Sequence, residues 1–93
     1  ESAHDAVSMG MIYKAFNDES FSEESKAIAK KLATMPTRGL GLTKRALNAS
    51  LNTTLSEQLK MEGDLQTEAG NTYDYNEGVA AFLEKRKPTF KGK

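Results

Sequence analysis

Apolar residues recur at every third or fourth position along most of this chain, whereas alternation of apolar and polar residues is scarce. The first spacing is typical of amphipathic helices and the second of strands. Glycine and proline fall between the helical stretches, where they favour turns. Residues 2–9 have the pattern of the end of a helix, which Gly10 would stop. About four main helices are predicted in the chain, so the expected fold class is all-α.

One short strand-like segment interrupts this pattern near the start. It runs from Met11 to Phe16 and reads MIYKAF. A strand of this length is not stable alone. It would have to pair with a sheet, and the rest of the chain predicts none. We therefore expect one strand-like segment in an otherwise helical chain.

Three pairs of residues have the spacing of a capping box, in which two side chains satisfy backbone N–H groups three positions apart. They are Ser20 with Glu23, Thr54 with Glu57, and Asp74 with Glu77. Thr37, directly after Pro36, has the chemistry of a single N-cap. Each of these sites is predicted to open a helix, and Pro88 is predicted to end the last one.

The last predicted helix is strongly polarised in charge. Residues 74–90 read DYNEGVAAFLEKRKPTF, acidic at the start and basic at the end. Both ends suit the helix dipole, so the polarity by itself needs no ligand. The basic end is nevertheless dense, with five cations in nine residues around Phe90: Lys85, Arg86, Lys87, Lys91 and Lys93. Such a cluster suits a phosphorylated, planar ligand, and a solubilising tail explains it equally well.

Composition narrows the class of protein. The chain has 93 residues, with 13 acidic and 13 basic side chains and no cysteine. This length allows one small domain, and neutral charge argues against a dedicated nucleic-acid binder, even one that uses the second and third predicted helices as a helix-turn-helix. Without cysteine there are no disulfides or thiolate zinc sites, which fits a reducing compartment. No apolar run approaches the length of about 18 residues that a membrane helix needs.

No motif for catalysis is apparent. The single histidine, His4, lies at no metal-ligand spacing from an acidic residue. The carboxylates of residues 57–68 fit a solvated helix face, and RGLGLTKR (residues 38–45) lacks the spacing of a phosphate-binding loop. We therefore predict no catalytic residues and no metal ligands in this chain.

Four stretches carry a resemblance to a known family. EGVAAFLEKRKPTF (77–90) resembles the C-terminal signature of the enoyl-CoA hydratase/isomerase (crotonase) family. LATMPTRGLGLTKRALN (32–48) resembles its helix pair after the core, and MGMIYKAF (9–16) the segment in which the last strand leaves that core. EAGNTYDYNEGVAAF (68–82) is most similar to one subgroup, the 2-(1,2-epoxy-1,2-dihydrophenyl)acetyl-CoA isomerases of phenylacetate catabolism.

The resemblance implies a division of the chain. Residues 1–93 would form a single C-terminal helical region, with residues 1–19 as the tail end of the core and residues 20–93 as the part that drives oligomer formation and caps the CoA site. In the family, the core supplies the oxyanion hole and the acidic catalytic residues. That core would lie upstream of Glu1, so the chain alone is expected to be inactive.

Two site residues follow from the resemblance. Phe82 and Lys85 match the family's Phe-x-x-Lys, whose side chains approach the adenine and phosphates of CoA. Phe82 also lies on the apolar face of the last predicted helix, so a packing role stays open. Acyl-CoA would be the substrate, and no separate cofactor is expected. The expected setting is a cytoplasmic homo-oligomer without nucleic-acid or membrane partners.

Two alternatives stay open for the function. The parent protein could be an enoyl-CoA hydratase of fatty-acid β-oxidation instead of a phenylacetate-pathway isomerase. The chain could also be a stand-alone helical interaction module that shares ancestry with the family but has no catalysis.

Overall fold

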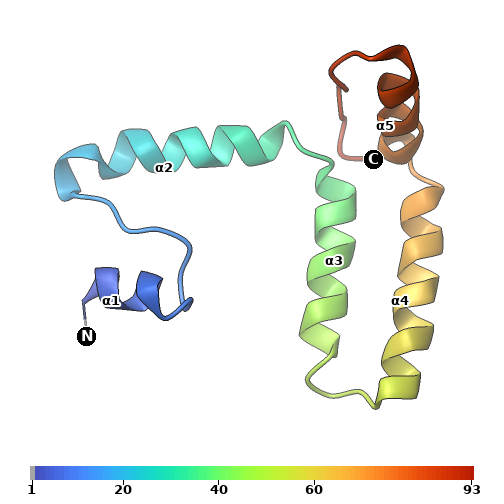
Figure 1. Cartoon of the computed structure of the whole chain (residues 1–93), viewed down its shortest axis with the longest axis horizontal. Helices are drawn as coiled ribbons and strands as arrows, with labels where there is room; N and C mark the ends of the chain where they lie inside the picture. The colour runs from blue at the N-terminus through green and yellow to red at the C-terminus, as the bar shows by residue number, and fades with distance from the viewer. Residues whose placement is uncertain (1) are drawn as a thin grey trace. The chain divides into compact units, whose positions relative to one another are not determined.

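Five helices joined by short connections make up the computed structural model, which describes residues 2–93 (Figure 1). Their bounds are α1 Ala3–Ser8, α2 Asp18–Ala33, α3 Thr37–Ala49, α4 Leu55–Gly70 and α5 Tyr73–Glu84. The all-α part of the expectation agrees with this. The count of about four helices is wrong, because residues 2–9 form a complete short helix in which Ser2 and Asp5 make a capping box.

The predicted strand-like segment is also wrong. Residues 11–16 form bends and irregular backbone, and no strand occurs anywhere in residues 2–93. The physical reason is the one that limits any short strand: its N–H and C=O groups need a neighbouring strand, and the described residues provide none.

The chain divides into two compact units, one up to Lys30 and one from Lys31 onward. In the first unit the rings of Phe16 and Phe21 meet edge to face, 6.3 Å apart between centroids. The ammonium group of Lys14 lies 5.4 Å from the centre of the Phe16 ring. The second unit carries α3, α4 and α5.

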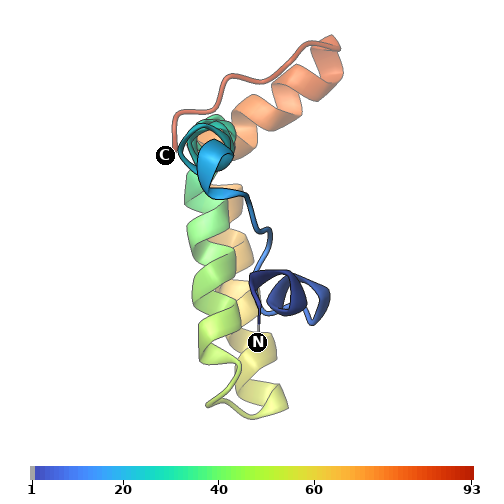
Figure 2. The ribbon, with the colours of Figure 1, turned by 90° about the vertical axis from the view of Figure 1, so that its left-hand side faces the viewer.

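Helices α3 and α4 form an antiparallel pair (Figures 1 and 2). Leu42 of α3, only 4% exposed, is the largest buried apolar side chain among residues 2–93. Two polar contacts tie the pair at opposite ends. Gln58 donates to the Ala46 carbonyl over 3.0 Å, and Arg38 pairs with Glu68 over 2.6 Å.

Of the three capping boxes predicted from the sequence, only one is confirmed. Thr54 and Glu57 satisfy each other's backbone N–H groups at the start of α4. Ser20 does not cap, because α2 already begins at Asp18 and the Ser20 hydroxyl donates to the Asn17 carbonyl. At α3 the cap position is Pro36, not Thr37, and no side-chain hydrogen bond is made there.

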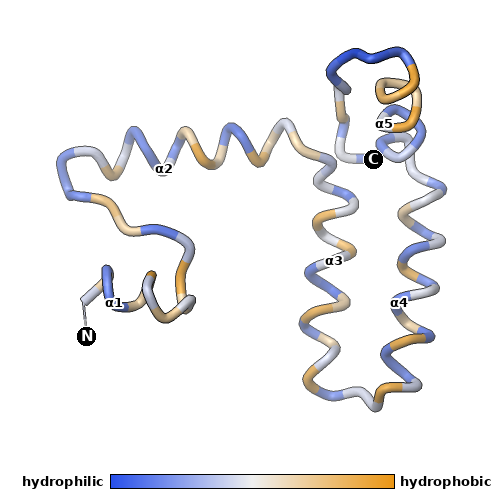
Figure 3. Tube along the Cα trace, in the orientation of Figure 1, coloured by the Kyte–Doolittle hydropathy of each residue, from blue (hydrophilic) through white to orange (hydrophobic). Residues whose placement is uncertain are grey.

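Much apolar surface is left uncovered within the described residues. Apart from Leu42, the only buried apolar side chain there is Ala81, while large apolar residues on all four longer helices are exposed. Figure 3 shows apolar positions along the helices and a strongly hydrophilic turn after α5. No helix among residues 2–93 is both long and apolar enough to cross a membrane.

Candidate functional site

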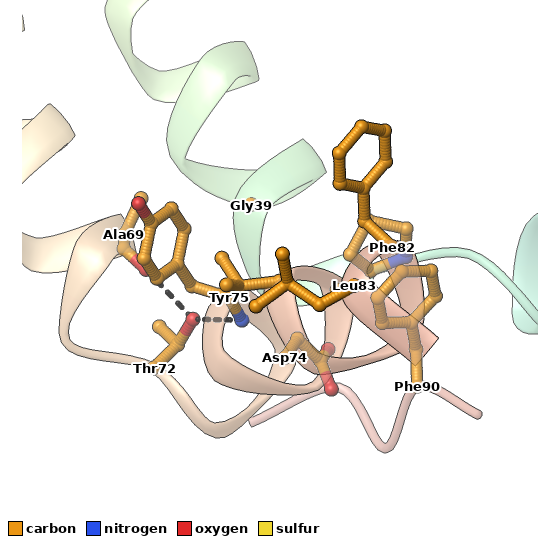
Figure 4. Close-up of a pocket in the computed structure, with 11 residues that line it drawn as sticks. Gly39, Ala69, Thr72, Asp74, Tyr75, Phe82, Leu83 and Phe90 are labelled. Atoms are coloured by element: carbon orange, nitrogen blue, oxygen red, sulfur yellow. Dashed lines mark hydrogen bonds between the residues drawn. The ribbon is translucent and has the colours of Figure 1, made fainter. Parts of the chain in front are cut away.

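Helix α5 begins with a cap that the sequence prediction missed. The hydroxyl of Thr72 accepts a hydrogen bond from the Tyr75 N–H over 3.0 Å and donates to the Ala69 carbonyl over 2.7 Å (Figure 4). This arrangement joins the last turn of α4 to the first turn of α5. The predicted capping pair Asp74 and Glu77 is therefore wrong, and both carboxylates are available for other partners.

The helix ends before the predicted stop at Pro88. Lys85 has the left-handed backbone conformation, with φ 56° and ψ 42°, and is the only residue other than glycine with positive φ among residues 2–93. Its N–H donates to the Phe82 carbonyl (3.3 Å), and the Arg86 N–H donates to the Ala81 carbonyl (3.0 Å). This pair of bonds is the Schellman motif, in which glycine is the usual central residue.

After Lys85 the chain turns back and runs alongside α5 (Figures 1 and 2). We call residues 86–93 the returning tail. Its far end meets the start of the helix, where Asp74 is only 3% exposed. The Asp74 carboxylate accepts hydrogen bonds from the N–H groups of Lys91 (2.7 Å) and Gly92 (2.9 Å). The Asp74 N–H in turn donates to the Lys93 carbonyl over 2.9 Å.

A second carboxylate, one turn further along α5, binds the near part of the returning tail. Glu77 accepts two hydrogen bonds from the Arg86 guanidinium, of 2.6 and 3.0 Å, and a third from the Thr89 N–H of 2.8 Å. The bond from Arg86, supported by that from Thr89, lowers the pKa of Glu77 from 4.5 to about 2. The carboxylate is therefore ionised throughout the neutral range.

An open apolar pocket of about 430 Å³ lies beside α5. Its wall combines side chains of α5 with Pro36 and Gly39 near the start of α3 and with Phe90 from the returning tail (Figure 4). Phe90 lies close to α5: a Cβ added at Gly78 would be 3.6 Å from the Phe90 ring. The tail therefore packs against the helix at this position, at a distance where a Cβ would make ordinary contact with the ring.

The two site residues expected from the resemblance lie at the end of α5. Phe82 is 82% exposed and is one of the residues that line the pocket. Lys85 follows three residues later, exposed, at the point where the chain reverses. The two residues are neighbours at the helix end, where the Lys85 N–H donates to the Phe82 carbonyl. Their contact with CoA stays a prediction.

The other cations of the tail are less uniform than the sequence suggests. Arg86 is held by Glu77 and also pairs with Glu84 over 3.0 Å. The Lys91 ammonium lies 4.7 Å from the centre of the Tyr73 ring, a cation–π distance. Within residues 2–93, the side chains of Lys85 and Lys87 form no hydrogen bond and no ion pair. Lys85 is thus better placed than Arg86 to meet an added phosphate.

Sequence reasoning missed the role of Asp74 and Glu77. Their i, i+3 spacing is shared by capping boxes and by any two carboxylates on one helix face, so the spacing alone does not separate the two. The basic tail that follows at Arg86 was the available signal. No group of three or more His, Cys, Asp or Glu residues suited to a metal ion occurs in the described part of the chain.

Comparison with known proteins gives the family. The family model described as "Enoyl-CoA hydratase/isomerase" matches residues 1–93. The 1,2-epoxyphenylacetyl-CoA isomerase of Escherichia coli is 48% identical over 92 residues, which cover 99% of this chain and 35% of that protein. A "probable enoyl-CoA hydratase" of Rhodobacter capsulatus is 42% identical, over 98% of this chain and 35% of that protein.

Solved structures agree with this relationship. An enoyl-CoA hydratase subunit I from Geobacillus kaustophilus superimposes with a TM-score of 0.89 at 36% identity, over 99% of this chain and 36% of that one. An enoyl-CoA hydratase from Bacillus anthracis gives 0.83 at 30% identity, over 99% and 36%. The chain thus spans about a third of the length of the relatives it matches. It belongs to the enoyl-CoA hydratase/isomerase family.

Proposed function

We propose that this chain forms the C-terminal helical part of a family enzyme and that it binds the nucleotide end of CoA and makes contacts between subunits. The observation that carries the proposal is the pairing of an exposed ring, Phe82, with an exposed cation, Lys85, at the end of α5. A ring can stack on adenine and an ammonium group can meet phosphates. The chemistry itself, oxyanion stabilisation included, would belong to the part of such an enzyme that this chain does not match.

For the parent enzyme we propose an isomerase acting on an epoxyphenylacetyl-CoA. This rests on the higher identity to the E. coli isomerase, 48%, than to the R. capsulatus protein, 42%. An enoyl-CoA hydratase is the second candidate, favoured by the hydratases among the similar structures. The catalytic role distinguishes both from a stand-alone interaction module.

The subunit contacts are supported by the uncovered apolar surface. Leu47 (66% exposed), Leu51 (87%) and Leu55 (76%) lie around the connection between α3 and α4. Exposed apolar area of this extent favours association, because each buried Å² contributes about 25 cal/mol. A second copy of the chain is the partner that we propose.

The CoA contact can be tested in a chimera, in which this chain replaces the aligned third of the E. coli isomerase. Lys85→Ala should raise the KM for 1,2-epoxyphenylacetyl-CoA roughly tenfold, the effect of losing one charge-assisted hydrogen bond. Lys44→Ala, which removes an exposed lysine of α3, is the matched control and should leave the KM unchanged. An unchanged KM for Lys85→Ala would refute the contact.

The choice of parent can be tested with a second chimera, built on the R. capsulatus protein. If the chain derives from an isomerase, the first chimera should retain its activity better than the second retains hydratase activity. The reverse order would favour the hydratase. Failure of both chimeras to assemble into active enzyme would favour the stand-alone module.

A further inference from the structure

The returning tail is held to α5 through its main chain. Asp74 accepts hydrogen bonds from the N–H groups of Lys91 and Gly92, and Glu77 accepts one from the N–H of Thr89. Main-chain N–H groups have fixed positions, whereas exposed side chains exchange rotamers readily. Hydrogen bonds of this kind therefore specify the path of the tail. They do more than neutralise its positive charge.

The order of these contacts along the chain is regular. Glu77 binds the residue twelve positions later, and Asp74, three positions before it, binds residues seventeen and eighteen positions later. The two carboxylates lie on one face of α5, because residues three apart are neighbours on a helix surface. The tail therefore runs antiparallel to the helix, fastened once near its start and once near its end.

Lys85 is the residue at which this antiparallel path begins. Arg86, the next residue, is fixed by Glu77 on the same helix, with two bonds of 2.6 and 3.0 Å. The chain reverses at Lys85, and this reversal precedes the contact of Arg86 with Glu77 on the same helix. A lysine in the left-handed conformation is unfavourable compared with glycine, so it needs surrounding structure to hold it there.

We propose that Asp74 and Glu77 are positioning residues for Lys85: by fastening the returning tail, they hold Lys85 in the left-handed turn from which it meets the phosphates of CoA. This inference rests on the CoA contact proposed above for Lys85. A simpler role is that the two carboxylates only stabilise α5. The two roles differ in whether their effect on CoA binding passes through the Lys85 side chain.

A double-mutant cycle in the E. coli chimera separates these roles. Glu77→Gln and Asp74→Asn should each raise the KM for 1,2-epoxyphenylacetyl-CoA, by roughly three- to tenfold, with kcat unchanged. In a Lys85→Ala background the same substitutions should change the KM no further. Lys85→Gly, which accepts the turn without help, should equal Lys85→Ala and be equally insensitive to Glu77→Gln.

Glu84→Gln is the matched control. It makes the same charge change and also removes a contact to Arg86, of 3.0 Å, but Glu84 binds no N–H of the tail. The KM of the Glu84→Gln chimera should equal that of the chimera without substitutions. Arg86→Lys provides a milder change if Asp74→Asn prevents folding, because lysine keeps the charge but loses the two-pronged contact. The KM of the Arg86→Lys chimera should lie between that of the unsubstituted chimera and that of the Glu77→Gln chimera.

The outcomes separate the inference from the proposal beneath it. If Lys85→Ala leaves the KM unchanged, the CoA contact fails and the positioning role falls with it. If Lys85→Ala raises the KM but Glu77→Gln and Asp74→Asn do not, only the positioning role is overturned. If Glu77→Gln raises the KM equally with and without Lys85, the carboxylates act by another route, and the inference is also wrong.

Discussion

Phe82 gives the sharpest test of whether the end of α5 is a ligand contact or a packing element. The residue is 82% exposed, so about a fifth of its surface is covered. For an aromatic side chain of about 200 Å², that is about 40 Å², which stabilises the fold by roughly 1 kcal/mol at most. Phe82→Ala should therefore lower the free energy of unfolding of this chain by about 1 kcal/mol or less.

The effect on CoA binding should be larger. Stacking of a base on an aromatic side chain contributes about 1–3 kcal/mol, so Phe82→Ala in the E. coli chimera should raise the KM for the acyl-CoA by roughly 5- to 150-fold. Phe82→Leu keeps most of the apolar area but removes the ring. If the ring stacks on adenine, leucine should bind nearly as poorly as alanine.

Two measurements decide the matter: chemical denaturation of the 93-residue chain and steady-state kinetics of the chimera. A Phe82→Leu chimera with the parent KM would refute the stacking role. So would a loss of 2 kcal/mol or more for Phe82→Ala in denaturation, which would show that Phe82 is packed far more than its exposed surface indicates.

Three further predictions concern the fold. Leu42→Ala should destabilise the α3–α4 pair by about 2–5 kcal/mol in thermal or chemical denaturation. Leu47→Ala, at a 66% exposed position of the same helix, should change the free energy of unfolding by no more than about 0.5 kcal/mol. Equal effects of the two substitutions would contradict the assignment of the core. The chain should self-associate in sedimentation velocity because of its uncovered apolar surface, and a monomer at every concentration would argue against that. The contact of Glu77 with Arg86 and Thr89 should persist well below pH 4.5 and disappear only as the pH falls towards about 2. The reason is that the pKa of Glu77 is lower in the folded chain than in the unfolded chain. The stability that the contact contributes is fully present above the unfolded-state pKa and is lost as the pH falls through the folded-state pKa. Amide exchange of Thr89 against pH measures this, and loss of protection already near pH 4.5 would show that the contact is not formed.

What the sequence predicts well is local. Thr54 and Glu57 satisfy each other within one helical turn, so their spacing is enough to predict the start of α4. Asp74 and Glu77 have the same spacing but bind residues 12 to 18 positions away. A three-residue pattern does not contain that information, since it depends on where the chain goes after α5.

The same limit explains the other differences. MIYKAF has the composition of a strand, but a strand forms only against a partner, and residues 2–93 offer none. The end of α5 was predicted at Pro88, which is the strongest local stop signal. The helix instead ends at Glu84, where the chain reverses and Arg86 binds Glu77. For the same reason sequence could suggest Phe82 and Lys85 by resemblance, but not the conformation of Lys85.

The main-chain attachment of the returning tail also bears on how this region can evolve. Every amino acid except proline carries the N–H that Asp74 and Glu77 bind, so the side chains at 89 and 91 can be exchanged without altering the route of the tail. Position 92 is the exception: Gly92 has φ 74°, and a Cβ there would lie 2.7 Å from the Thr37 hydroxyl. The charge of the tail at positions 89 and 91 can thus change by ordinary point substitution while the path of its main chain stays the same.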